Sequence, residues 1–217
     1  MTLNNVNIAP SNKPSNNKMY KTIPIQKNNF KNTSSADVLE IWFDRIKESF
    51  YGDILKKVKK PIIYKMEEFS GKNLKEEVIK RSQYVDIDIS AKTALIKKIK
   101  KINPKIKIIM SYHDYKKTPY EKELTGIYGK MLKKGADIVK FATHAKEIGD
   151  SFRILDFLSS LGHKNQEAIC VCMGAHGHLT RISGHLFGNY MMYFAADEKS
   201  KTAPGQITIK EFNELII

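Results

Sequence analysis

The alternation of short apolar runs with amphipathic segments is the feature that most constrains the fold of this chain. Strands are predicted over eight ranges: 18–25, 36–44, 61–67, 84–89, 105–111, 137–142, 167–173 and 190–195. Helical patterns lie over 72–81, 91–102, 119–134, 146–161 and 180–187, and the segment 207–215 closes the chain. Apolar strands that alternate with helices indicate parallel βαβ units, and eight of them predict an α/β chain folded as a closed (β/α)8 TIM barrel.

A doubly wound open sheet is the alternative, but no glycine-rich phosphate loop follows the first strand. About ten residues separate the first two strands, which is too few for a full crossover helix. We therefore expect an abbreviated first crossover. Residues 1–17 are mostly Asn, Ser, Pro and Lys with little apolar content, so they are predicted to form a disordered tail. Residues 18–217 are then expected to form one barrel domain.

The net charge of +14 first suggests a nucleic-acid partner or another polyanion. Only four of the 37 basic residues are arginines, however, and base readout and bidentate phosphate contacts favour arginine. The lysines are scattered, and many lie on predicted helix faces such as 55–60 and 91–101. The pattern predicts a solvated lysine-rich surface and no specific nucleic-acid partner.

Compartment and redox chemistry follow from what the sequence contains. No apolar run reaches transmembrane length and the N-terminus has no apolar core like that of a signal peptide, so we expect a cytoplasmic protein without a membrane partner. Cys170 and Cys172 are too few for a disulfide framework. Two positions apart on a predicted strand, they are expected to be small core thiols on one face.

A lysine and a histidine are the first candidates for chemistry, because a barrel carries its active site at the C-terminal ends of its strands. His113 follows the fifth strand, and Lys140 lies in the sixth among apolar neighbours. Burial lowers the pKa of a lysine and makes it a nucleophile; the alternative is a lysine that extends to water at a strand end. Together Lys140 and His113 offer a Schiff-base former and an acid/base group.

Two glycine-containing segments supply the other candidates. The segment 173–184 begins with Met173 and contains Arg181, which can clamp a carboxylate with two hydrogen bonds. The segment 202–206 has the Pro-Gly of an ordered turn on a loop that can close over a site. The histidines at 144, 176 and 178 share no helical face and have no accompanying carboxylate spacing, so no metal site is predicted.

Four motifs stand in one order along the chain, at 111–119, 135–140, 173–184 and 203–206. Together they resemble the type I 3-dehydroquinate dehydratase family, the Schiff-base enzymes of the shikimate pathway of aromatic amino acid biosynthesis. The motifs cover much of the chain from about residue 105 onward. The resemblance implies a TIM barrel, a hydro-lyase that acts on a small anionic keto acid, and no metal or organic cofactor. A homodimer is suggested by the resemblance alone, because no feature of the sequence indicates an oligomeric state.

The resemblance also implies roles for single residues. Lys140 forms an imine with the C3 ketone of 3-dehydroquinate, and His113 takes the C2 proton and returns it to the departing C1 hydroxyl, which gives 3-dehydroshikimate and water. Arg181 holds the substrate carboxylate. Gln206 and Thr202, the latter at a position where the family usually has serine, lie on the closing loop. Glu40 and Met173 complete the implied substrate-binding set.

The N-terminal half departs from the family pattern. Trp42 stands where the family has an arginine two positions after Glu40, Glu67 stands where it usually has another, and an acidic residue is missing near Gly71. In the family these groups contact ring hydroxyls, so their loss alters recognition. We rank three hypotheses: a dehydroquinate dehydratase with compensating contacts from Lys65, a Schiff-base lyase for a related cyclic keto acid without those hydroxyls, and a weakened homologue that acts by binding.

Overall fold

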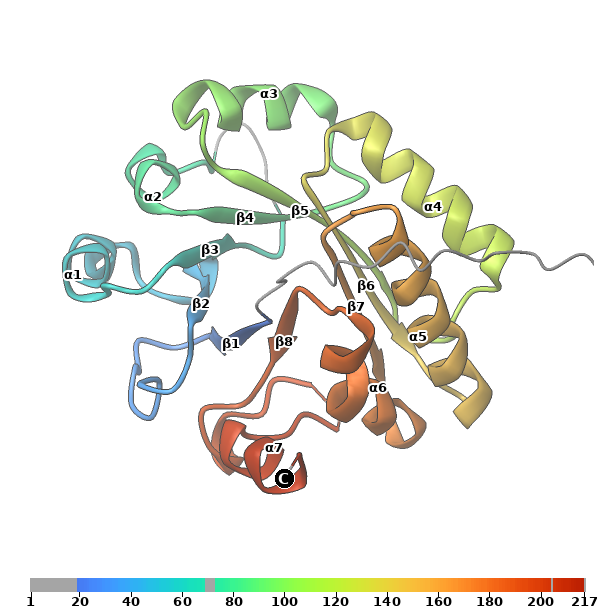
Figure 1. The fold of residues 1–217 in the computed structure, drawn as a ribbon. Coiled ribbons are helices and arrows are strands. Elements are labelled where there is room, and N and C mark those ends of the chain that lie inside the picture. Colours follow the sequence, from blue (N-terminus) through green and yellow to red (C-terminus); the bar gives the residue numbers. More distant parts are fainter. Residues whose placement is uncertain (1–18, 69–72, 204, 217) are drawn as a thin grey trace, which may run out of the picture.

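The computed structural model describes residues 19–68, 73–203 and 205–216. Eight parallel strands curl into a nearly closed barrel in the order β7-β6-β5-β4-β3-β2-β1-β8, with helices around the outside (Figure 1). The strands are β1 (Tyr20–Ile25), β2 (Val38–Trp42), β3 (Ile62–Lys65), β4 (Tyr84–Asp88), β5 (Lys107–Asp114), β6 (Ile138–His144), β7 (Ala168–Met173) and β8 (Met191–Tyr193). The predicted TIM barrel is therefore confirmed.

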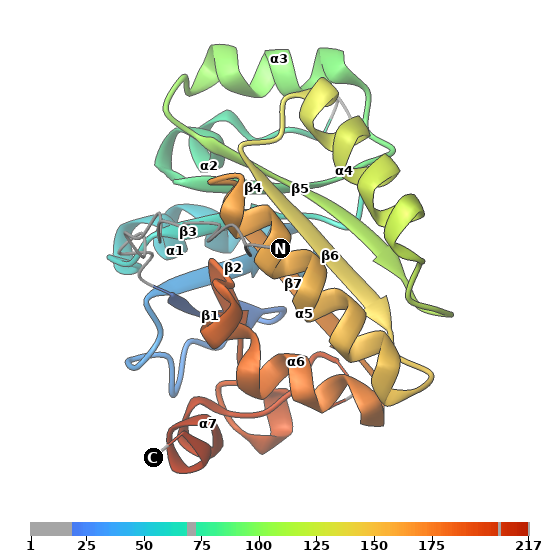
Figure 2. The same ribbon diagram turned by 45° about the vertical axis from the view of Figure 1, so that its right-hand side comes forward.

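The helices lie between the strands, and the longest, α5, crosses the outside of the barrel in Figure 2. They are α1 (Tyr51–Lys57), α2 (Glu76–Arg81), α3 (Thr93–Ile102), α4 (Glu121–Lys134), α5 (Ile148–His163), α6 (His178–Ser183) and α7 (Ile209–Leu215). Short 3-10 turns η1 (Phe43–Arg45) and η2 (Glu48–Phe50) lead into α1, and η3 (Ala175–Gly177) leads into α6. Gly135 ends α4 in the left-handed conformation, at a φ of 92°, as expected of a glycine cap.

The first crossover is abbreviated, as predicted. Residues 26–37 join β1 to β2 through turns and contain no helix (Figure 1). On this side of the barrel a groove is lined by apolar side chains that include Phe30, Phe50 and Ile54. The helix α1, which follows β2, borders the groove and begins earlier than the helix face expected over 55–60.

A side chain closes the seam of the barrel between β7 and β8. The Cys170 amide donates a hydrogen bond of 2.9 Å to Oδ1 of Asn189, and Nδ2 of Asn189 donates one of 3.0 Å to the Cys170 carbonyl. One backbone bond, from the Tyr190 amide to the Ala168 carbonyl at 2.8 Å, supports the same junction. The buried Asn189 amide thus takes the place of a strand ladder here.

The barrel interior is built in layers, because every second residue of a strand points inward. The lower layer is apolar and consists of Val38, Ile63, Tyr84, Ile109, Ile138, Ile169, Tyr190 and Met191. The next inward position on five strands is polar and buried: Glu40, Lys65, Asp86, Ser111 and Lys140. The charged layer therefore lies above the apolar layer, on the side of the C-terminal ends of the strands.

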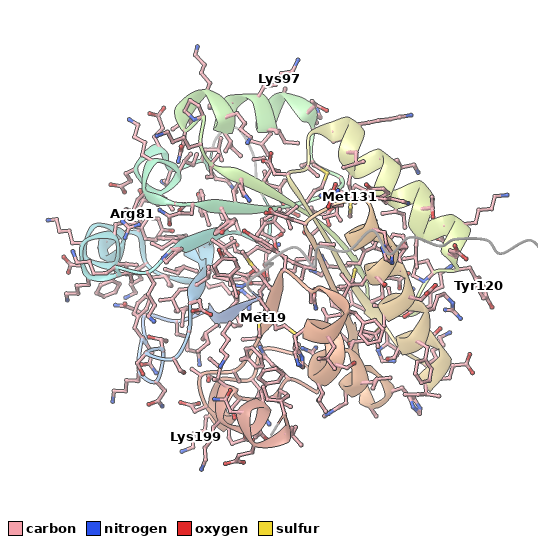
Figure 3. The ribbon with its side chains drawn as sticks, in the orientation of Figure 1. Met19, Arg81, Lys97, Tyr120, Met131 and Lys199 are labelled. Atoms are coloured by element: carbon pink, nitrogen blue, oxygen red, sulfur yellow. The ribbon has the colours of Figure 1, made fainter. Side chains whose placement is uncertain are left out.

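The lysine-rich surface follows from helices such as α3. Leu95, Ile96 and Ile99 are buried against the barrel, while Lys97 and its neighbours on the other side are exposed. In Figure 3 the side chains of Lys97 and Lys199 extend away from the barrel. No described helix is both long and apolar enough to cross a membrane. The predicted tail over 1–17 and the predicted change at Gly71 lie outside the described residues.

Candidate active site

Asp86 is the centre of the charged layer. Its Oδ2 lies 2.7 Å from Nζ of Lys140, and its Oδ1 lies 2.7 Å from Nζ of Lys65. The Ser111 hydroxyl donates a third hydrogen bond, of 2.8 Å, to Oδ1. Complete burial opposes ionisation of Asp86, but the ammonium groups of Lys140 and Lys65 hold its pKa well below the ordinary value. One carboxylate therefore binds two buried lysines.

Lys140 has a second acidic partner, since Oε2 of Glu40 lies 3.3 Å from its Nζ. Burial lowers the pKa of Lys140, but Asp86 and Glu40 outweigh burial and raise the pKa well above its ordinary value. The expectation that the pKa of Lys140 lies below its ordinary value is therefore wrong for the protein without substrate. The adjacent residues Val139 and Phe141 face outward, and Phe141 packs against Phe157 of α5. Carboxylates from β2 and β4 face the lysine.

Tyr193 of β8 completes the surroundings of Lys140. The Lys140 ammonium lies 4.2 Å from the centroid of the Tyr193 ring, close enough for a cation–π contact. Burial and the Glu40 carboxylate raise the pKa of Tyr193 well above its ordinary value, so its phenol keeps its proton. An aromatic wall and two carboxylates therefore hold the Lys140 ammonium in place.

His113 lies one inward step above the charged layer. It pairs in register with Ala142 of β6, two residues beyond the pair of Ser111 and Lys140. Desolvation and the positive charge of Lys140 lower the pKa of His113 to about 4. The imidazole is therefore neutral near pH 7 and can accept a proton. Its ring stacks on that of Tyr115, with 6.1 Å between the ring centroids.

Arg181 lies on α6 and is 5% exposed. The preceding residue fixes this helix to the barrel, because the Cys172 amide donates a hydrogen bond of 2.8 Å to the Thr180 hydroxyl. Burial lowers the pKa of Arg181 to about 10, so the guanidinium stays charged at neutral pH. Arg181 lines a small cavity together with Tyr193, whose ring also contacts Lys140. The structure thus brings Lys140, Tyr193 and Arg181 to one part of the barrel.

The remaining predicted residues lie on the loops after β7 and β8. Met173 is the last residue of β7 and is nearly buried. Oε1 of the buried Gln206 accepts hydrogen bonds from the Thr202 amide at 2.7 Å and from its hydroxyl at 3.0 Å. Gly205 has a φ of 76°, and a Cβ there would lie 3.0 Å from Nε2 of His178. A glycine is therefore needed where this loop packs against the start of α6.

The two departures from the family pattern lie together at the mouth of the barrel. Nε1 of Trp42 donates a hydrogen bond of 3.0 Å to Oε1 of Glu40. The guanidinium of Arg45 lies 4.3 Å from the centroid of the Trp42 ring and forms an ion pair with Glu67. The arginine at this edge of the barrel therefore comes from position 45, and it stacks on the indole that replaces the family arginine.

Sequence reasoning missed Asp86 and Tyr193. The signal for Asp86 was available, because Asp86 and Asp88 alternate along an otherwise apolar strand, where an inward carboxylate needs a partner. Tyr193 gave no such signal, since its place beside Lys140 depends on closure between β8 and β1. Among residues 19–68, 73–203 and 205–216, no three His, Cys, Asp or Glu side chains are grouped to hold a metal ion.

Comparison with known proteins places this arrangement in a family. The family model described as type I 3-dehydroquinase matches residues 21–216. A 3-dehydroquinate dehydratase of Methanococcus maripaludis is 34% identical over 195 residues, which cover 83% of this chain and 87% of that protein. One of Methanocaldococcus jannaschii is 34% identical over 194 residues, which cover 83% and 86%.

A solved structure agrees on the fold. The type I 3-dehydroquinate dehydratase of Clostridium difficile, solved with covalently modified comenic acid, superimposes with a TM-score of 0.76 at 21% identity over 91% of this chain and 90% of that one. The family match spans nearly all of the described barrel, and the sequence relatives are matched over most of their own length. The chain therefore belongs to the type I 3-dehydroquinase family.

Proposed function

We propose that this chain dehydrates 3-dehydroquinate to 3-dehydroshikimate through an imine on Lys140, as a hydro-lyase of the shikimate pathway. The observation that carries the proposal is the buried Lys140, bound to Asp86 and Glu40, with the neutral His113 above it on the next strand. Membership of the type I family supports the reaction, since relatives of this chain are named 3-dehydroquinate dehydratases.

The first step is loss of a proton by Lys140, which rests as an ammonium. The His113 imidazole is neutral at pH 7 and is the acceptor. The free amine then attacks the C3 ketone to form a carbinolamine. His113 returns its proton to the carbinolamine hydroxyl, which leaves as water, so the products are a protonated imine and a neutral imidazole. The carboxylates of Asp86 and Glu40, which held the ammonium, stabilise the positive charge of the imine.

Elimination follows from the electron demand of the protonated imine. His113 accepts the C2 proton, which leaves an enamine, and the enamine expels the C1 hydroxyl as water with the proton from His113. Hydrolysis of the conjugated imine consumes the water that imine formation released and frees Lys140. The balance is one 3-dehydroquinate converted to one 3-dehydroshikimate and one water, and no step requires a metal or organic cofactor.

Arg181 binds the substrate carboxylate in this proposal. Its guanidinium is buried and charged and shares a cavity wall with Tyr193 beside Lys140. Met173 lies at the end of the neighbouring strand and lines the substrate, while the loop with Thr202 and Gln206 closes over it. Closure excludes water and strengthens every charged contact inside the site.

The activity is tested by the absorbance of the enone product. The protein with 3-dehydroquinate should produce this absorbance, and Lys140→Met should abolish it while the variant stays folded. Lys97→Met is the matched control, because Lys97 is exposed on α3. No enone formation by the unaltered protein over a range of pH would exclude 3-dehydroquinate as the substrate.

The mouth of the barrel favours one second candidate. Trp42 and Glu67 stand where the family pattern has arginines, and both contact Arg45. This difference favours a Schiff-base lyase for a related cyclic keto acid with fewer ring hydroxyls. A panel of such keto acids, assayed beside 3-dehydroquinate, distinguishes the two, and binding without turnover of any of them would indicate a homologue that acts only by binding.

The assembly rests on the family resemblance alone, and the location is an expectation from the sequence. We propose a homodimer in the cytoplasm. Light scattering after size-exclusion chromatography should give the mass of two chains, and fractionation of cells should recover the protein with the soluble contents. A mass of one chain would refute the dimer without affecting the proposed reaction.

A further inference from the structure

Lys65 shares the depth and the carboxylate of Lys140. The two lysine side chains are each 7% exposed, and their ammonium groups bind the two oxygens of Asp86 at 2.7 Å. A ligand that reaches Nζ of Lys140 therefore also reaches the layer of the barrel that holds Nζ of Lys65. We propose that Lys65 is a specificity-determining residue that donates a hydrogen bond to a substrate hydroxyl, an inference that rests on the proposed function.

The direction of the substrate places Lys65 near the C4 and C5 hydroxyls. Lys140 is on β6 and Arg181 follows β7, so the ketone and the carboxylate are bound on one side of the barrel. In 3-dehydroquinate the carboxylate is on C1 and the ketone is C3, so C4 and C5 continue the ring beyond the ketone. The strand order places β3, with Lys65, across the barrel from β6 and β7.

Other donors on this side of the barrel are already engaged. Nε1 of Trp42 donates to Glu40, and the guanidinium of Arg45 is bound by Glu67 and by Oε1 of Gln26 at 2.6 Å. An ammonium has three N–H donors, and the hydrogen bond of Lys65 within the described residues is to Asp86. Lys65 is therefore a buried donor on β3 that can still serve a ligand hydroxyl.

This role predicts a strong preference for a substrate that carries the hydroxyls. A site that hydrogen-bonds a hydroxyl rejects an analogue without it, because the buried donor is then left unpaired. The analogue to compare is 1-hydroxy-3-oxocyclohexane-1-carboxylate, which keeps the carboxylate, the C1 hydroxyl and the ketone of 3-dehydroquinate but lacks the C4 and C5 hydroxyls. Both compounds undergo the same elimination, so their ratio of kcat/KM isolates recognition.

The experiment measures this ratio in the unaltered protein and in Lys65→Met. We expect the unaltered protein to prefer 3-dehydroquinate by at least about 100-fold and Lys65→Met by less than about 10-fold, with the loss falling on 3-dehydroquinate. Lys100→Met is the matched control, because the Lys100 ammonium is also bound to a carboxylate, that of Asp137 at 2.8 Å, but outside the barrel. This control should keep the full preference.

The same ratio separates this role from its alternatives. If Lys65 acted only by placing Asp86 or by changing the pKa of Lys140, Lys65→Met would slow both compounds by the same factor, which would overturn the proposal. An unaltered protein that turns over 3-dehydroquinate without preferring it would also overturn it and leave the proposed function intact. A protein that dehydrates neither compound would instead refute the proposed function.

Discussion

Lys140 and Lys65 bind opposite oxygens of one carboxylate, that of Asp86, each at 2.7 Å. The carboxylate is completely buried, and Ser111 donates a further hydrogen bond to it. Two buried ammonium groups therefore share one carboxylate, and Lys140 has Glu40 as a second partner. Both the stability of the barrel and the chemistry of its lysine depend on this arrangement.

Replacing Asp86 should destabilise the protein strongly. Asp86→Asn leaves two buried ammonium groups with too little compensating charge, and breaking a buried pair in this way costs about 3–5 kcal/mol of the free energy of unfolding. Urea unfolding measures the loss. The double variant Asp86→Asn with Lys65→Met should recover part of it, because one stranded charge is removed.

The control for this experiment is Asp156→Asn, since Asp156 is an exposed carboxylate on α5. It should change the free energy of unfolding by no more than about 0.5 kcal/mol. An Asp86→Asn variant as stable as this control would contradict the view that the charged layer depends on Asp86.

His113 should make the free energy of unfolding depend on pH. Its pKa is about 4 in the folded protein, against 6.5 for an ordinary histidine, so between these values the unfolded chain binds more protons. This contribution to stability is complete above pH 6.5 and is lost as the pH falls toward 4. Urea unfolding of His113→Gln should therefore show a shallower loss of stability over this window than the unaltered protein.

A second histidine variant is the control for the effects of acid on the protein as a whole. His163 is exposed at the end of α5, and His163→Gln should keep the pH dependence of the unaltered protein. Parallel curves for His113→Gln and the unaltered protein would mean that His113 titrates normally and is not held neutral in the barrel mouth.

Arg181 should act mainly through substrate binding. Arg181→Lys keeps the charge but loses the planar pair of donors that fits a carboxylate, so kcat/KM should fall by about 10- to 100-fold, chiefly through KM. Steady-state kinetics with 3-dehydroquinate measures the effect, and Arg81→Lys, on α2, is the matched control. An unchanged KM would contradict carboxylate binding by Arg181.

The side-chain amide of Asn189 should contribute strongly to the free energy of unfolding. Asn189→Leu leaves the backbone N–H and C=O of Cys170 without their partners, at about 1–3 kcal/mol for each buried group. Urea unfolding should show a loss of about 2–6 kcal/mol, and hydrogen exchange of the Cys170 amide should become faster. Asn28→Leu is the control, because Asn28 is exposed. Equal stability of the two variants would contradict the view that Asn189 holds β7 and β8 together.

The sequence predicted the barrel well because its signals are local. Eight apolar runs and the helical patterns between them follow from side-chain periodicity, and the helix end at Gly135 follows from its conformational freedom. The short first crossover followed from chain length alone. The C-terminal end of β5 could not be predicted in this way. The strand continues past Ser111 and His113 to Asp114, because its pairing with β6 extends that far.

The electrostatics of the site depend on contacts distant in sequence. Lys140 and Glu40 are 100 residues apart, and no local pattern shows that Glu40 and Asp86 face the lysine and reverse the effect of burial on its pKa. The pairing of Arg45 with Glu67 likewise explains a departure that sequence alone presented as the loss of a guanidinium. The sequence showed which charged residues are present. Which of these charges neutralise each other could be seen only in the folded structure.

The most direct test is the covalent adduct itself. The protein is mixed with 3-dehydroquinate, reduced with borohydride, weighed by mass spectrometry and digested to locate the change, with Lys140→Met treated in parallel. We predict a stable increase of one ligand mass on the peptide that contains Lys140, and none in the variant. No adduct together with no enone absorbance, or an adduct on another lysine, would contradict an imine on Lys140 as the centre of the reaction.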